Sequence, residues 1–163
     1  MKKHTLTVCL LLCTAVLLCG CRVLPVAQVP SLPDSPLSSL YFSESHSYVT
    51  PIRGYEYRLE DGKHMVYFEL PYPDEPYPVQ ADQRWADTLL QFIGQYEMMG
   101  WKDFHGSDSL LLDGTSFFCS FAFADGTEIT ASGYGEFPGH YSEASAAIEA
   151  HFRQLLPEDM LDW

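Results

Sequence analysis

Two cysteines near the amino terminus are the first residues whose types and spacing could do chemistry. Cys19 and Cys21 end an apolar run in the stretch LLCGC, with one glycine between them. A thiolate can act as a redox group, a metal ligand or a covalent attachment point. The pair could therefore be a redox couple, half of a metal site or the mark of a processing event.

The residues before this pair have the three zones of a secretory signal peptide. Lys2 and Lys3 give a positive start, residues 6–18 are apolar apart from two threonines, and Gly20 is small. The apolar segment is shorter than the roughly 20 residues that a helix needs to span the hydrocarbon core. We therefore predict a signal peptide over residues 1–20 that is cleaved on export.

The stretch Leu18-Cys19-Gly20-Cys21 resembles the lipobox of bacterial lipoproteins. That motif is a leucine, a small residue and a glycine or alanine, followed by the cysteine that is lipidated. Cys19 stands where alanine or serine is usual, and it is similar to them in size. The resemblance implies that Cys21 carries a diacylglycerol thioether and begins the mature chain. Acyl chains such as palmitate would then hold the protein on the extracytoplasmic face of the cell membrane, since two or more chains anchor stably.

Cleavage before Cys21 leaves Cys119 as the single unmodified cysteine, which excludes an intramolecular disulfide and a multi-cysteine metal site. It removes two lysines and no acidic residue, so the net charge of −13 becomes −15. Such acidity argues against binding to nucleic acid or to anionic lipid surfaces. The predicted partners are the membrane, through the lipid anchor, and an extracellular glycan, peptide or protein.

The other titratable residues match no catalytic or metal-binding motif. No nucleophile elbow, phosphate-binding loop, zinc-binding helix motif or calcium-binding loop is present in the sequence. The histidines lack the spacing of a zinc site. We therefore predict no catalytic residue, no metal site and no cofactor, and we favour a non-enzymatic protein over an enzyme. The histidines that remain after cleavage are His46, His64, His105, His140 and His151.

Two loops, GWKDFHGSD (100–108) and GYGEFPGHY (133–141), are richer in aromatic and polar residues than a connection needs. Aromatic rings beside polar groups on glycine-rich loops suit a sugar or peptide ligand, since one surface supplies both stacking and hydrogen bonds. The alternative is that these rings plug the ends of the sheet. The candidate ligand-binding residues are Trp101, His105, Tyr134, His140 and Tyr141.

Residues 21–40 are predicted to be the lipidated cysteine and an extended tether. Their prolines and serines are too dense for helix formation or sheet pairing and favour an extended chain. The remaining residues, 41–163, have the length of one domain. We expect the tether to hold this domain away from the bilayer.

The stretch YEYRLEDGKHMVYFEL (55–70) predicts a β-hairpin with a two-residue turn at Asp61-Gly62. One face of this hairpin collects the apolar residues, which defines the register. The expected pairs are Leu59 with His64, Tyr57 with Val66 and Tyr55 with Phe68. The polar residues on the other face are Glu56, Arg58, Glu60, Lys63 and Glu69.

Two helices are expected. The prolines of residues 71–78 exclude a strand interior there. A helix from about Asp82, capped at Gly100, carries an apolar stripe that begins at Trp85. A second helix begins near Ser142, which is a candidate N-cap, and Pro157 ends it.

Between the helices, residues 109–133 are predicted to form a three-stranded meander. Its last turn is best closed by three residues, Ala124-Asp125-Gly126, because this loop pairs Phe121 with Ile129 on one apolar face. The same register buries Cys119 in the core as a small apolar residue. The element order is then β-β-α-β-β-β-α. This order predicts an α+β two-layer domain with a mainly antiparallel five-stranded sheet and both helices on one face.

Residues 113–152 are similar to a stretch found in small uncharacterised lipoproteins of anaerobic Gram-positive bacteria, although Phe117 stands where those often have Trp. This resemblance implies no activity, because a shared fold does not define one. Our main hypothesis is an envelope-anchored lipoprotein that presents a binding domain. The alternatives are an extracellular hydrolase of cell-wall or dietary glycans, and a structural or inhibitory protein whose acidic surface binds a basic partner.

Overall fold

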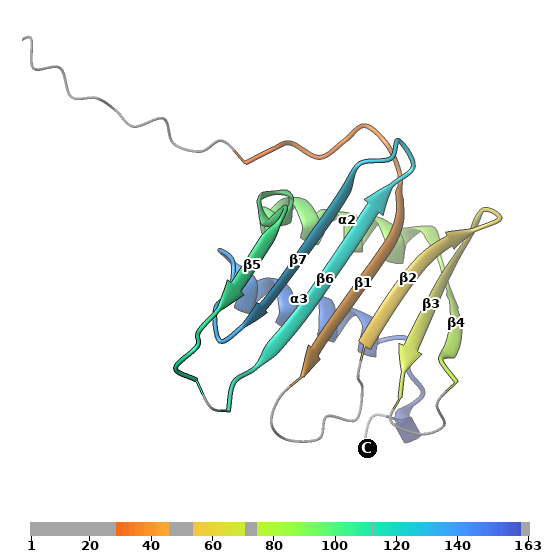
Figure 1. The fold of residues 1–163 in the computed structure, drawn as a ribbon. Coiled ribbons are helices and arrows are strands. Elements are labelled where there is room, and N and C mark those ends of the chain that lie inside the picture. The colour runs from red at the N-terminus through yellow and green to blue at the C-terminus, as the bar shows by residue number, and fades with distance from the viewer. Residues whose placement is uncertain (1–28, 46–53, 71–74, 112, 161–163) are drawn as a thin grey trace, which may run out of the picture.

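The computed structural model describes residues 29–45, 54–70, 75–111 and 113–160. The predicted signal peptide, the lipobox and Cys21 lie outside these ranges. Two α-helices cover one face of a β-sheet (Figure 1), so the predicted α+β class is confirmed. The elements are β1 (Leu37–Ser45), β2 (Gly54–Glu60), β3 (Lys63–Glu69), β4 (Tyr77–Ala81), α2 (Gln83–Gln95), η1 (Met98–Trp101), β5 (Phe104–Ser107), β6 (Ser116–Phe123), β7 (Glu128–Tyr134), α3 (Tyr141–Arg153) and η2 (Glu158–Met160).

The sheet has seven strands in the order β4-β3-β2-β1-β6-β7-β5. All neighbouring strands are antiparallel except β5 and β7, which are parallel. The sheet is therefore mixed, and the prediction of five mainly antiparallel strands is wrong in strand number. The strands that the sequence does not predict are β1, β4 and β5.

β1 lies at the centre of the sheet, between β2 and β6, although its first four residues belong to the predicted tether. Pro36 directly precedes the strand, so the proline-rich segment ends where sheet pairing begins. Leu40 and Phe42 are buried on the core face, while Tyr41 alternates with them and points to the other face. The tether prediction fails for residues 37–40 because this alternation, not proline content, decides their conformation.

The chain ahead of β1 also contacts the domain. Leu32 is partly buried against the core, and a Cβ added at Gly94 of α2 would lie 3.0 Å from its Cδ1. A Cβ added at Gly100 would likewise lie 3.6 Å from the side chain of Val29. Ahead of β1, the described part of the predicted tether therefore contacts the helical layer through Val29 and Leu32.

β4 and β5 are the two edge strands. β4 contains Pro78, which pairs opposite Tyr67 of β3. Proline is tolerated at an edge, because no outer neighbour needs its missing N–H group. β5 lies in the segment expected to be a ligand-binding loop. The predicted strand near Ser109 is replaced by a turn, in which the Asp108 carboxylate accepts the N–H of Leu110 at 2.9 Å.

The two predicted hairpins are confirmed in register. β2 and β3 pair as expected around the Asp61-Gly62 turn, where both residues have positive φ angles. β6 and β7 pair Phe121 with Ile129, and Gly126 has a φ of 89° in the three-residue loop. Cys119 is buried in this register, as predicted.

The helices differ from prediction at their ends. α2 begins where expected, behind Asp82, whose carboxylate accepts the N–H of Trp85 at 2.8 Å, but it ends at Gln95 and not at Gly100. α3 begins at Tyr141 behind His140, so Ser142 is not the N-cap. After α2, residues 98–101 form a 3₁₀ helix. Before α3, His140 adopts a left-handed conformation. The chain turns at both places. Within the described ranges, none of the helices has the length and apolarity to cross a membrane.

Candidate functional site

Within the described residues, both α-helices lie on one face of the sheet, and neither covers the opposite face (Figure 1). We call this surface the open face. It consists of the side chains that alternate with the buried core residues along the strands. Its main residues, from the strand register, are Tyr41, Ser43, Glu56, Arg58, Met65, Tyr67, Glu69, Phe118, Ser120, Thr130 and Ser132.

Tyr41 is held in place at the centre of this face. Its hydroxyl donates to Oε2 of Glu69 at 3.0 Å, from β1 to β3. The strand between them carries Gly54 at that position, which leaves room for the contact. Burial of the ring raises the pKa of Tyr41, and Glu69 adds to the rise. The phenol therefore remains a neutral donor.

Arg58 organises a second group on β2 and β3. Its Nε and Nη2 atoms donate to the two oxygens of Glu56 at 2.6 and 2.7 Å, a bidentate pair. The guanidinium carbon lies 5.1 Å from the centre of the Tyr67 ring. Tyr67 in turn donates to Glu60 at 2.9 Å. We call these four residues the Arg58 cluster.

Phe118 adds an apolar contact area. Its side chain is 40% exposed, and its ring centre lies 5.9 Å from that of Tyr41. Together the two rings form a small aromatic contact area on this face. Tyr41, Phe118 and the Arg58 cluster together give the open face both stacking surface and paired charges.

Two of the predicted ligand-binding residues lie in the core. Trp101 is 2% exposed, and its Nε1–H donates to the carbonyl of Gly139 at 2.9 Å. Tyr141 is buried against Phe117, with ring centres 4.5 Å apart, and donates to Glu44 at 2.6 Å. Burial and the Glu44 carboxylate raise the pKa of Tyr141. Both rings fill the end of the sheet, as the alternative interpretation expected.

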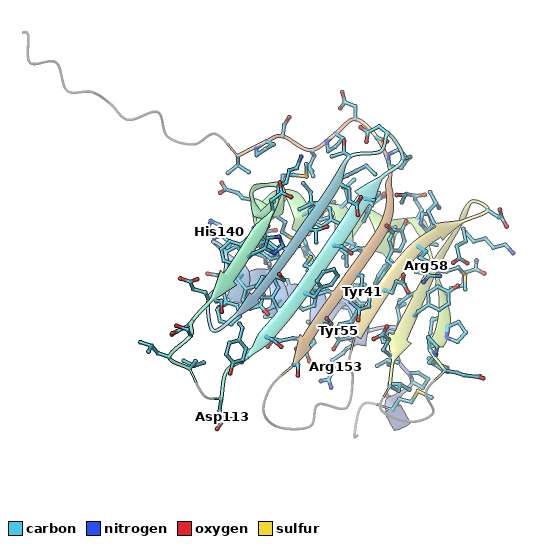
Figure 2. The ribbon with its side chains drawn as sticks, in the orientation of Figure 1. Tyr41, Tyr55, Arg58, Asp113, His140 and Arg153 are labelled. Atoms are coloured by element: carbon cyan, nitrogen blue, oxygen red, sulfur yellow. The ribbon has the colours of Figure 1, made fainter. Side chains whose placement is uncertain are left out.

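The other three predicted residues lie at separate places. His105 is on β5, with Nδ1 2.9 Å from the hydroxyl of Ser132 at the rim of the open face. Tyr134 accepts the N–H of Gly114 at 3.1 Å in a loop contact. His140 precedes α3 and is marked with Tyr41 and Arg58 in Figure 2, well away from both. The structure therefore does not gather the five predicted residues into one site.

The described part of the chain shows no group of three or more histidine, cysteine, aspartate or glutamate side chains that could hold a metal ion. Cys119 is fully enclosed, and its burial raises the pKa of the thiol to about 12. A thiol that stays protonated near neutral pH is a poor nucleophile. On the open face, Tyr41, Phe118 and the Arg58 cluster offer stacking, hydrogen bonding and ion pairing.

Comparison with models of known protein families and with curated proteins finds no match to this chain.

Proposed function

We propose that this chain is a lipid-anchored protein of a bacterial envelope, displayed outside the membrane, whose open face binds a partner protein. The observation that carries the proposal is the uncovered sheet face with its fixed aromatic and charged side chains. Side chains already held by hydrogen bonds and ion pairs lose little conformational entropy on binding. Such preorganisation favours a binding surface over a merely solvated one.

A protein partner suits this face better than a small ligand. Small ligands bind in concave pockets, whereas the open face is one side of a broad sheet. Its residue types are also those enriched at the centres of protein interfaces: tyrosine, phenylalanine, methionine and arginine. Phe118, Tyr41, Met65, Tyr67 and Arg58 supply them here.

The charge of the chain favours a basic partner. The sequence carries 22 acidic and 9 basic residues. On the open face, Glu60 and Glu69 lie beside the aromatic residues, and both accept hydrogen bonds from tyrosines. A partner with lysine or arginine at its rim would be steered toward this surface, and the association rate would fall as salt is added.

The open face has no feature that favours a glycan hydrolase. Glycoside hydrolysis uses two carboxyl groups on opposite sides of the substrate. Glu56 is paired with Arg58, Glu60 accepts from Tyr67, and Glu69 accepts from Tyr41. These contacts organise a surface and do not create an acid and base pair.

Site-specific crosslinking in the native host tests the proposed surface. A photoreactive amino acid at Ser120, between Tyr41 and Thr130, should give one discrete crosslinked product on the full-length lipoprotein. The matched control is the same amino acid at exposed Glu143 of α3. Phe118→Ser should remove the Ser120 product without loss of the folded protein. Crosslinks of equal strength from both positions, or a product that survives Phe118→Ser, would contradict the proposal.

The membrane anchor has its own test. Cys21→Ala should move the protein from the membrane fraction to the soluble fraction and abolish incorporation of labelled palmitate. Cys119→Ala is the matched control, because it removes a cysteine that would carry no lipid. Retention of the Cys21→Ala protein in the membrane with unchanged mobility would rule out lipidation at Cys21.

A further inference from the structure

A groove of about 300 Å³ lies on the helix side of the sheet, separate from the open face. It is bounded by the β2–β3 hairpin, the start of β1 and the first turns of α2. Leu37, Leu59 and Leu90 form its apolar wall, and His64, Gln83 and Asp87 form its polar wall. A groove of this size is within the range of small-ligand sites.

The polar wall is one continuous chain of hydrogen bonds. The Tyr57 hydroxyl lies 2.8 Å from His64 Nδ1, and His64 Nε2 lies 3.0 Å from Gln83 Oε1. The Gln83 amide nitrogen then donates to Asp87 Oδ1 at 2.8 Å. Tyr57 also stacks on the imidazole, with ring centres 5.9 Å apart. The chain therefore runs from the buried core to an exposed carboxylate.

The direction of these hydrogen bonds follows from Asp87. An ionised carboxylate only accepts, so the nitrogen of the Gln83 amide must face Asp87 and its oxygen must face His64. In the neutral imidazole, Nε2 of His64 then carries the proton and Nδ1 accepts from Tyr57, whose hydroxyl also lies 3.4 Å from the Leu37 carbonyl. Burial raises the pKa of Tyr57 to about 12, with a smaller contribution from Asp87, so the phenol keeps its proton for this bond.

This direction leaves the groove rich in acceptors. Both ring nitrogens of His64 and the hydroxyl hydrogen of Tyr57 already take part in hydrogen bonds within the chain. The second oxygen of Asp87 has no partner among the described side chains, and Gln83 Oε1 has a second lone pair. A negative charge and a carbonyl thus face a wall of leucines, which suits a cation with an apolar chain.

We propose that this groove binds an alkylammonium group. The ammonium would donate to Asp87 and to Gln83 Oε1, and the alkyl chain would lie against Leu59 and Leu90. Such a group could belong to a free aliphatic amine or to a lysine side chain of a peptide. The site does not depend on the open face or on the lipid anchor.

Calorimetric titration of the full mature chain with hexylammonium tests the inference, with hexanol and hexanoate as neutral and anionic analogues. We expect hexylammonium to bind at least about tenfold more tightly than either analogue, because only it can pair with Asp87. Asp87→Asn should weaken this binding by about tenfold. Asparagine still accepts the hydrogen bond of Gln83, so the fold should be retained. Glu128 on β7 is exposed on the open face, because it alternates with buried Ile129. Glu128→Gln removes one negative charge there and should change the affinity less than about twofold.

Three outcomes would overturn the proposal: no binding of hexylammonium, equal binding of hexanol or hexanoate, or equal effects of Asp87→Asn and Glu128→Gln. A second titration, with Nα-acetyl-lysine methylamide, identifies the source of the group. Tighter binding than hexylammonium would indicate a peptide lysine, and weaker binding would indicate a free amine. Either result supports an alkylammonium site if Asp87→Asn weakens the tighter ligand.

Discussion

The hydroxyl of Tyr41 on β1 donates to Glu69 on β3 at 3.0 Å, directly above Gly54 of the intervening strand. A Cβ at Gly54 would lie 2.8 Å from the tyrosine oxygen and 2.9 Å from the carboxylate oxygen. Glycine at this position therefore allows two strands that are not neighbours to be joined on the open face.

Gly54→Ala should break this hydrogen bond, because both atoms near the new methyl group are the ends of side chains and can move. Gly54→Ala should lower the unfolding free energy by about 1 kcal/mol more in the wild type than in the Tyr41→Phe protein, which has no hydroxyl to lose. Urea denaturation of the four proteins of this cycle measures the coupling. Additive effects would show that Gly54 does not serve the Tyr41–Glu69 contact.

The aromatic residues at the end of the sheet should behave as core residues. Trp101→Ala removes a buried ring and its hydrogen bond to Gly139, so it should cost about 3–5 kcal/mol of unfolding free energy. Lys102→Ala is the control from the neighbouring position, since this side chain is exposed and its φ of −49° is unstrained. It should cost less than about 0.5 kcal/mol. Similar small effects for both substitutions would contradict the core role of Trp101.

His151 should make the domain less stable in acid. Its ring is buried between helices, stacks on Trp85 with centres 4.4 Å apart, and bonds the Trp85 carbonyl at 2.9 Å. Burial lowers the pKa of His151. The unfolded chain then binds a proton at a higher pH than the folded one, so stability falls as the pH drops below the ordinary histidine pKa of about 6.5.

The measurement is unfolding free energy against pH for the wild type and for His151→Gln. Carboxylates contribute to the pH dependence of both proteins, but only the wild type has the histidine contribution. The wild type should therefore lose more stability between about pH 7 and 5. Parallel curves for the two proteins would argue against this role of His151.

Cys119 should be unreactive in the folded protein. Its thiol is 1% exposed and keeps its proton near neutral pH, as its pKa of about 12 requires. Iodoacetamide should modify it only after denaturant unfolds the chain, as followed by mass spectrometry. Cys119→Ser should destabilise the fold by about 1–3 kcal/mol through the buried hydroxyl, and Cys119→Ala by less. Rapid labelling without denaturant would contradict the enclosed position of the thiol.

Local pattern predicted the parts of the fold that depend on neighbouring residues. The two hairpin registers follow from turn residues and from the two-residue alternation of apolar side chains, and both are confirmed. The start of α2 near Asp82 follows from the apolar stripe that begins at Trp85. The polar face of the first hairpin, with Glu56 and Arg58, was also visible in this alternation.

The open face could not be predicted as a site, because it joins strands that are distant in sequence. β1 pairs with β6 across more than 70 residues, and only this pairing brings Phe118 beside Tyr41. The predicted loop residues do not form one site for a related reason. Part of the first predicted loop is strand β5, which pairs with β7. Trp101, which ends η1 ahead of β5, packs in the core against Phe117 and Tyr141, whereas His105 on β5 lies at the rim beside Ser132.

The sequence by itself determined the α+β class, the two hairpins and the acidic character, since these depend on composition and on contacts between near neighbours. Only the tertiary structure decided which strands are adjacent, which face the helices cover, and how Asp87 on α2 connects through Gln83 to His64 on the hairpin. These features depend on burying the apolar faces of all elements together. That requirement sets long-range pairings that no local window of sequence contains.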